Sequence, residues 1–358
     1  MIANAGPGGH PRAQLVDVPL QFVVGKGGVG KSTLTAALAL RSAARGLRTL
    51  VVEFGGHGGV SRLFAREPAK TGAPSVVAPN LSLLSLEGDE ALAEYLRMVF
   101  PIKRVLAAVL SNRLYSVFVA GAPGLKELMT VGKVWYEAER TIGKTPGGAK
   151  VWQHVFVDAG ASGHSLQYLQ MPSAAVATFR SGIVHRESAR VQAMLSDPAR
   201  TCVHVVAAPE EMPVTEACAI VTRLRDSLGL PLGTLFMNRC RRPSPPGARP
   251  ALAMLDCMLG NLDAGANSAT PPTPACDDEA LLALTREAVD AALEWEIVQE
   301  AAIARAEAET GLACERLPLL VREEFGLAEA VELADILGDG DSAAASTSDD
   351  ARGRGDAT

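Results

Sequence analysis

A glycine-rich run near the N-terminus, GKGGVGKS at residues 25–32, limits the folds open to this chain more than any other stretch. It follows a short apolar run at 20–25, which predicts a buried strand. Residues 31–45 then predict a helix, and the apolar residues 47–54 predict a second buried strand. Strand, glycine loop, helix and strand in this order are typical of an α/β fold with a doubly wound, mostly parallel sheet.

The loop itself fits the phosphate-binding pattern G-x-x-x-x-G-K-[ST], and the flanking strand and helix are the context that this pattern requires. Glycines let backbone N–H groups turn toward phosphate oxygens, and the amino end of the helix adds partial positive charge. We expect Lys31 to reach the β- and γ-phosphates of ATP and Ser32 to bind Mg²⁺. The predicted nucleotide contacts of the loop are Gly25, Lys26, Gly27, Gly28, Val29, Gly30, Lys31, Ser32 and Thr33.

Composition and charge argue against several classes of protein. Of the 358 residues, 48% are hydrophobic but only 4% are aromatic, which favours Ala-, Val- and Leu-rich helices packed on a parallel sheet. A net charge of -6 gives no basic face for nucleic acid. Six separated cysteines without a CxxC pair indicate a reducing compartment. With no signal sequence and no transmembrane segment in evidence, we expect a cytoplasmic protein.

The run KGGVGKS places a lysine at Lys26 in addition to Lys31, and it resembles the deviant Walker A phosphate loop of the ArsA-like ATPases. That group includes the arsenite-pump ATPase, the ATPase that targets tail-anchored membrane proteins, MinD and ParA. There the first lysine reaches across a dimer interface to the nucleotide of the facing subunit, so the resemblance implies a dimer and this catalytic role for Lys26. A second cation at the γ-phosphate would stabilise the charge of the transition state.

A second segment resembles the ArsA-like branch in particular, because MinD and ParA lack its G-H-x-L pattern. VFVDAGASGHSLQYLQMP, at residues 155–172, is similar to the switch II of that branch. The similarity implies that Asp158 holds Mg²⁺ and that Gly163 lies near the γ-phosphate. His164 matches the histidine of the family.

The base-binding residues are implied by two later segments. A strand near residue 238 ends in Asn238 and Arg239, at the position where the family reads the adenine edge with an asparagine. Pro318 lies in RLPLL, which resembles the family's C-terminal segment near the base. The resemblance therefore implies adenine contacts from Asn238, Arg239 and Pro318.

The chain departs from the family at switch I, where the family has D-P-A-H-S and its aspartate polarises the attacking water. Aligning His57 with the family histidine puts Phe54 at the aspartate position, and Glu53 is then expected to point to the opposite side of the strand end. We expect hydrolysis that is slow, or rescued by Glu53 or by a partner subunit. The variant is similar to an actinobacterial and myxobacterial branch of paired ArsA-like ATPases, which implies a homodimer or a heterodimer with a paralogue.

Composition along the chain predicts its organisation. Residues 1–17 predict a flexible leader, residues 18–337 the ATPase domain, and residues 338–358 a disordered tail. Within the domain, residues 89–145 predict a helical insertion and residues 241–280 a Pro-rich surface excursion. By resemblance, the insertion implies a groove for a hydrophobic protein client or a membrane-protein partner. Burial in the core is the alternative for its amphipathic helices.

Three functions stay open from the sequence. The first is an ArsA-like, Mg-ATP-dependent ATPase whose nucleotide state moves the helical subdomain against a partner. The second is a hydrolysis-weak nucleotide-binding subunit that regulates a paralogous ATPase. The third, a small-molecule kinase or synthetase of the same loop superfamily, lacks a recognisable acceptor pocket and fits the switch II pattern less well.

Overall fold

Eight strands form a single sheet in the order β3-β4-β2-β5-β1-β6-β7-β8, and only the pair β3 and β4 is antiparallel. The computed structural model describes residues 18–55, 58–65, 72–86, 124–143, 148–160, 162–245, 247–248, 250–254, 257 and 276–350. The strands are β1 (Leu20–Gly25), β2 (Thr49–Phe54), β3 (Ser75–Ala78), β4 (Leu81–Leu86), β5 (His154–Asp158), β6 (Thr201–Ala207), β7 (Leu232–Cys240) and β8 (Cys314–Pro318).

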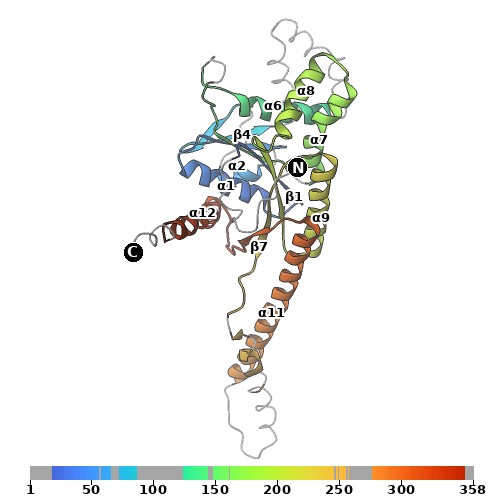
Figure 1. The fold of residues 1–358 in the computed structure, drawn as a ribbon. Helices are drawn as coiled ribbons and strands as arrows, with labels where there is room; N and C mark the ends of the chain where they lie inside the picture. The colour runs from blue at the N-terminus through green and yellow to red at the C-terminus, as the bar shows by residue number, and fades with distance from the viewer. Residues whose placement is uncertain are drawn as a thin grey trace, which may run out of the picture.

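Helices cover both faces of this sheet, which confirms the predicted doubly wound α/β class. Figure 1 shows α1 and α12 on one side of the strands and α9 and α11 on the other. The first layer contains α1 (Lys31–Ala44), α2 (Gly59–Leu63) and α12 (Leu327–Asp350). The second contains α6 (Leu125–Glu139), α7 (Ser162–Thr178), α8 (Gly182–Leu195), α9 (Glu211–Thr222), its π-helical continuation η2 (Arg223–Ser227), and α11 (Cys276–Thr310).

Two hydrophobic cores lie between the sheet and these layers, and strand β1 contributes to both. Phe22 and Val24 belong to the core under α6–α9, whereas Val23 belongs to the core under α1 and α12. Successive side chains of a strand point to opposite faces, so a strand covered on both faces is largely apolar. This requirement explains the mainly apolar runs from which the central strands were predicted.

The edge strands β3 and β8 escape prediction because their sequences do not carry that signal. Val76 of β3 is 73% exposed, so the strand has little buried apolar material. In β8, CERLP, two of the five residues are charged, and only Glu315 and Leu317 are buried. Short and polar edge strands are common because a sheet edge that is long and apolar promotes aggregation.

The C-terminal helix extends past the predicted end of the ATPase domain. Helix α12 is assigned from Leu327 to Asp350, and the disordered tail expected at residues 338–358 stays a prediction. The additional residues include the run SAAAS, and alanine has the highest intrinsic helix propensity. The leader at 1–17, the last residues 351–358 and the greater part of the insertion lie outside the described residues, so those predictions are not tested.

Helix α11 forms an arm that projects from the sheet (Figure 1). The chain leaving β7 runs along it, because the Arg241 N–H donates to Gln299 Oε1 at 2.7 Å and Gln299 Nε2 donates to the Arg241 carbonyl at 3.2 Å. The Arg241 guanidinium also lies 4.7 Å from the centre of the Trp295 ring. Among the helices that the structure describes, none is both long and apolar enough to cross a bilayer.

A buried polar chain ties β1, β6 and β7 together near their amino ends. The Thr234 N–H donates to His204 Nδ1 at 2.9 Å, so the other ring nitrogen, Nε2, carries the proton toward Gln21 Oε1 at 3.0 Å. Gln21 Nε2 in turn donates to the Val18 carbonyl at 2.9 Å. Burial lowers the pKa of His204 to about 4, which keeps the imidazole neutral in this chain of hydrogen bonds.

Candidate nucleotide site

The glycine loop joins the carboxyl end of β1 to the amino end of α1, the position at which doubly wound sheets bind ligands. Gly30 precedes the helix with a φ of 96°, in the left-handed region that favours glycine. A Cβ atom at this position would lie only 2.2 Å from Asn238 Nδ2. The loop can therefore start α1 in this geometry only with glycine at position 30.

Lys31 is folded back into the loop. Its Nζ donates a hydrogen bond to the Lys26 carbonyl at 2.7 Å, and the side chain is 7% exposed. Burial lowers the pKa of the Lys31 ammonium, while the Asp158 carboxylate opposes that shift. An ammonium held inside a ring of loop carbonyls and amides is placed to receive phosphate oxygens.

Ser32 and Asp158 meet at the first turn of α1. Ser32 Oγ donates to Asp158 Oδ2 at 2.5 Å, while Asp158 Oδ1 is buried and has no hydrogen-bond partner among the described residues. Burial raises the pKa of Asp158, and Glu53 raises it further; the Ser32 hydroxyl and Lys31 act in the opposite direction. A buried carboxylate oxygen without a donor is costly unless a cation occupies the site. The pair therefore fits Mg²⁺, which takes a hydroxyl, one or two carboxylates and phosphate oxygens.

Glu53 lies beside this pair and not away from it, which corrects the expected orientation. Residues Glu53 and Asp158 are partners in the register of β2 and β5, and both carboxylates are buried. A Cβ atom on Gly59 would lie 2.4 Å from Ser32 Oγ and 3.5 Å from Glu53 Oε1. The side chains of Ser32 and Glu53 therefore both lie next to Gly59. A carboxylate thus stands at the site even though Phe54 replaces the aspartate of the family.

Phe54 points to the opposite face of the sheet. Its ring packs against Tyr168 of α7, with ring centroids 4.6 Å apart, in the core under α6–α9. Strand alternation accounts for the difference, because Glu53 shares the α1 face with Val51 while Phe54 shares the α7 face with Val52. An alignment on His57 therefore selects Phe54, whereas the side chain of β2 that faces the loop is the preceding residue, Glu53.

The amino end of α2 holds the Glu53 carboxylate. Val60 N–H donates to Oε1 at 3.1 Å, whereas Oε2 accepts from Ser61 Oγ at 2.7 Å and from the Ser61 N–H at 3.4 Å. The Ser85 hydroxyl approaches Oε2 at 3.5 Å. Oε1 has the fewer donors and retains capacity to accept another hydrogen bond.

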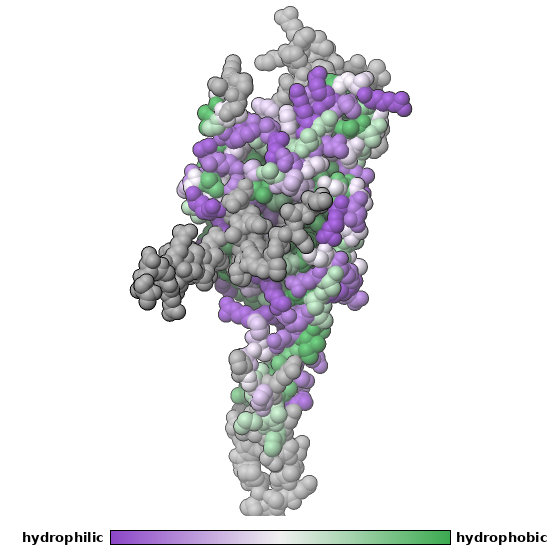
Figure 2. All heavy atoms as spheres, viewed as in Figure 1, coloured by the Kyte–Doolittle hydropathy of each residue, from purple (hydrophilic) through white to green (hydrophobic). Residues whose placement is uncertain are grey.

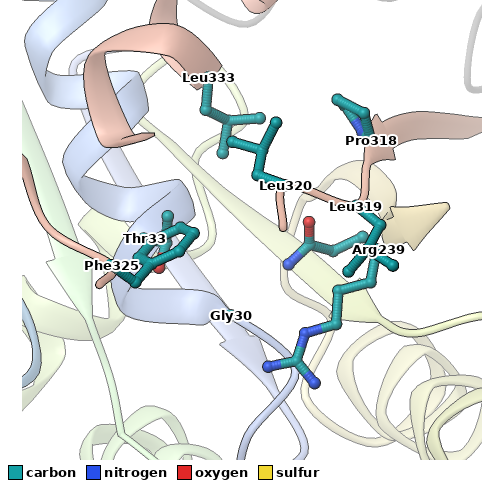
Figure 3. Close-up of a pocket in the computed structure, with 9 residues that line it drawn as sticks. Gly30, Thr33, Arg239, Pro318, Leu319, Leu320, Phe325 and Leu333 are labelled. Atoms are coloured by element: carbon teal, nitrogen blue, oxygen red, sulfur yellow. The ribbon is translucent and has the colours of Figure 1, made fainter. Parts of the chain in front are cut away.

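A pocket of about 280 Å³ opens beside the loop, and its lining includes Asn238, Arg239 and Pro318, the three residues predicted to contact adenine. Figure 3 shows Arg239, Pro318 and Leu319 on one side of it and Thr33 and Phe325 on another. The full lining is Gly30, Thr33, Asn238, Arg239, Pro318, Leu319, Leu320, Phe325 and Leu333. Apolar walls with a few polar groups are usual for a site that receives an aromatic ring.

Asn238 connects this pocket to the loop. Its Nδ2 donates to the Val29 carbonyl at 2.8 Å, and the side chain is buried. The next residue, Arg239, has a φ of 63°, uncommon for a residue other than glycine, where the register between β7 and β8 shifts. The irregularity sets two consecutive side chains, Asn238 and Arg239, along the pocket wall.

The remaining predicted residues are placed as follows. Lys26 is partly exposed at the lip of the loop, and its side chain makes no ion pair with a described residue. Gly163 lies in the first turn of α7, while His57 and the side chain of His164 fall outside the described residues. Sequence reasoning assigned no contact to Gly59, although the run GGHGG of switch I contains it. Leu319 and Leu320 lie in the RLPLL segment that the resemblance placed near the base, but only Pro318 of that segment was named as a contact.

Comparisons with known proteins agree with this geometry. The family model for ArsA-type anion-transporting ATPases matches residues 19–187. ATPase BagA of Mycobacterium tuberculosis is 30% identical over 248 residues, which cover 67% of this chain and 71% of that protein. An arsenical pump-driving ATPase of Acidiphilium multivorum is 29% identical over 157 residues, 44% of this chain and 26% of that protein. ATPase GET3 of Meyerozyma guilliermondii is 24% identical over 157 residues, 42% and 45% of the two chains.

Proposed function

The chain belongs to the family of ArsA-type ATPases, and on that premise we propose that it binds Mg-ATP at the glycine loop and hydrolyses it as a dimer. One observation carries the proposal. Glu53 and Asp158 are buried side by side at the loop, and Ser32 and Lys31 are the groups that face them. Two adjacent buried carboxylates with one buried ammonium leave negative charge uncompensated, which a divalent cation would neutralise.

Each residue has a proposed task in that reaction. Ser32 and Asp158 would hold Mg²⁺, which would neutralise charge on the phosphate oxygens. Lys31 exchanges its hydrogen bond with the Lys26 carbonyl for one with the β- and γ-phosphates. Glu53 Oε1 orients the attacking water, because it is the less engaged oxygen of that carboxylate.

We further propose that Lys26 acts on the nucleotide of the facing subunit. The lysine lies at the lip of the loop, next to the exposed Gly27 and Gly28, so a second protomer can approach it. A cation brought to the γ-phosphate from outside stabilises the transition state in the way an arginine finger does. The facing subunit is a second copy of this chain or a paralogous ATPase.

The link to a client or partner runs through α7. This helix begins at Ser162, only four positions after Asp158, and packs against both α6 and α8. A change of ligands at Asp158 therefore acts directly on the start of the α6–α8 layer. We propose that nucleotide exchange shifts this layer, on which a hydrophobic protein client or a membrane-protein partner is engaged.

A hydrolysis-weak regulatory subunit is the second candidate, and one observation favours it. The Glu53 carboxylate is anchored to α2 and β4 by Val60, Ser61 and Ser85. A carboxylate that stays in these contacts would hold α2 at the metal site without activating water. The chain would then bind Mg-ATP with little turnover of its own.

Calorimetry of ATP binding with Mg²⁺ and a phosphate-release assay, both on the full chain, test these proposals. We expect Lys31→Ala to abolish binding, and Glu53→Gln to retain binding while hydrolysis falls about 10²-fold or more. Phe54→Leu is the matched control because its side chain lies on the other face of β2, and it should retain turnover. Absence of ATP binding by the wild type would refute the proposal. Unchanged hydrolysis in Glu53→Gln would show that Glu53 does not orient the water. ATP binding without turnover by the wild type would favour the regulatory subunit.

The role of Lys26 has a separate readout. We expect Lys26→Ala to bind ATP with nearly the wild-type affinity in the monomer and to lose turnover. Sedimentation with Mg-ATP should show the wild-type protein, alone or mixed with a paralogue, as a dimer. Full turnover by a strictly monomeric wild-type protein would contradict a role in a facing subunit.

A further inference from the structure

One wall of the pocket beside the loop is made jointly by two neighbouring strands. Asn238 and Arg239 belong to the end of β7, whereas Pro318 ends β8 and Leu319 follows it. Figure 3 shows Arg239, Pro318 and Leu319 on the same side of the pocket. The Leu319 N–H donates to the Cys240 carbonyl at 2.8 Å, so the two strand ends are bonded to each other. The direction of these two strand ends therefore determines where the wall stands relative to the glycine loop.

Helix α11 holds both strand ends through two consecutive residues. Gln299 makes two hydrogen bonds with the main chain of Arg241, at 2.7 and 3.2 Å, just after the β7 part of the wall. Glu300 accepts from both Nη atoms of Arg316 on β8, at 2.6 and 2.9 Å, just before the β8 part of the wall. Each contact thus lies two positions along the chain from a wall residue, and each acts on a different strand.

The β7 part of the wall has a backbone geometry that needs support from its surroundings. Arg239 has a φ of 63°, which is uncommon for a residue other than glycine, and the register between β7 and β8 shifts there. A residue stays in such a conformation only when the structure around it imposes it. The Gln299 side chain is 5% exposed, so its two bonds to the chain after Arg239 are shielded from water. Gln299 is therefore placed to impose the path that β7 takes along the pocket.

The ion pair on β8 is the weaker of the two contacts. The Glu300 and Arg316 side chains are each 47% exposed, and Figure 2 shows hydrophilic side chains around the end of α11 next to the sheet. An exposed pair contributes little to stability, because water and salt screen it. Its two parallel hydrogen bonds still fix an orientation between the helix and the strand. Loss of this pair should therefore affect the position of the wall more than the stability of the fold.

We propose that Gln299 and Glu300 are positioning residues for the base of the nucleotide, because they hold the ends of β7 and β8 that form the wall. The inference rests on the proposed binding of Mg-ATP at the glycine loop. The phosphate part of that site lies between β1 and α1, whereas Gln299 and Glu300 bond to the chain after β7 and to β8. The affinity for the base thus depends on contacts of α11, and the affinity for the phosphates does not.

The test compares Mg-ATP with Mg-tripolyphosphate, which offers phosphates to the loop without a base, by calorimetry on the full chain. Gln299→Met keeps the length of the side chain and removes both hydrogen bonds. We expect this variant to bind ATP about fivefold more weakly, the equivalent of one lost hydrogen bond. Its affinity for tripolyphosphate should equal that of the wild type. A loss of folded protein would lower binding of both ligands alike, so the difference between the ligands reports position and not stability.

Glu300→Ala tests the second contact on an exposed side chain, and it carries the test by itself if Gln299→Met does not fold. Its matched control is Glu309→Ala. Glu309 forms an ion pair of similar exposure with Arg305, but both of these residues belong to α11, so no strand is held. We expect Glu300→Ala to weaken ATP binding about twofold, and Glu309→Ala to leave it unchanged. Neither variant should change tripolyphosphate binding.

The outcomes separate this inference from the proposed function. A wild type that binds neither ligand would refute the nucleotide site, and the inference with it. Wild-type ATP binding by Gln299→Met, or equal weakening of both ligands, would overturn the inference and leave the nucleotide site intact. Equal ATP affinity in Glu300→Ala and Glu309→Ala would remove Glu300 from it. A wild type that binds ATP but not tripolyphosphate would also overturn it, because the phosphates and the base would then not contribute separately.

Discussion

Replacing Gly30 by alanine tests whether the loop and the base pocket form one unit. An alanine with a φ near 96° incurs about 1–2 kcal/mol for the left-handed region. Its Cβ would lie 2.2 Å from Asn238 Nδ2, so the amide must move and lose its hydrogen bond to the Val29 carbonyl, at about 0.5–1.5 kcal/mol. The reduced freedom of the unfolded chain returns about 0.4–1 kcal/mol. We therefore expect Gly30→Ala to lower the free energy of unfolding by about 0.5–3 kcal/mol.

Gly27→Ala is the control, because a Cβ atom there meets nothing within 4 Å and the residue lacks a positive φ. Urea unfolding without nucleotide should place it within about 0.5 kcal/mol of the wild type. In a double-mutant cycle, Asn238→Ala removes the side chain with which the new Cβ collides. The free energy of unfolding lost by the double variant should then be smaller than the sum of the losses of the two single variants by about 0.5–1.5 kcal/mol. Equal stability of Gly30→Ala and Gly27→Ala, or strict additivity in the cycle, would refute the reasoning.

Two further predictions concern buried titratable groups. Asp158→Asn should weaken Mg²⁺-dependent ATP binding in calorimetry. Without Mg²⁺, the thermal midpoint of this variant should be unchanged or higher, because burial already raises the pKa of the Asp158 carboxyl and disfavours its charge. A lower thermal midpoint would contradict this prediction. His204 has a pKa of about 4 in the folded protein, below the unfolded value near 6.5. Its contribution to the free energy of unfolding is therefore complete above pH 6.5 and declines as the pH falls toward 4. Between pH 7 and pH 5, the free energy of unfolding should therefore fall by about 2 kcal/mol more in the wild type than in His204→Gln. An equal fall in both proteins would show that His204 does not cause the pH dependence.

The central strands and the loop could be predicted because a single physical requirement determines each of them. A strand buried on both faces is largely apolar, and a backbone that turns its N–H groups toward phosphate needs glycine, so β1, β2 and residues 25–32 are visible in the sequence. The edge strands β3 and β8 meet no such requirement. Their pairing depends on neighbours distant in the chain, which a local pattern does not record.

The orientation of Glu53 was predicted incorrectly because an alignment by residue identity does not determine which face of a strand a side chain occupies. The face follows from the apolar neighbours: Val51 and Glu53 lie under α1, while Val52 and Phe54 lie under α6–α9. For the pocket beside the loop, the RLPLL segment with Leu319 and Leu320 was recognised by resemblance, whereas Phe325 reaches the pocket through tertiary packing that no local pattern records.

The central place of β1 has a consequence for the order in which the chain acquires its shape on the ribosome. The strand that leads into the glycine loop is synthesised well before its two neighbours, β5 at His154–Asp158 and β6 at Thr201–Ala207. The apolar cover of α1 comes later still, from Leu333 and Leu337 of α12. A nascent chain that has emerged only as far as residue 150 holds the whole GKGGVGKS run without the framework that orients it. The glycine loop is therefore translated well before the strands and the helix that orient it.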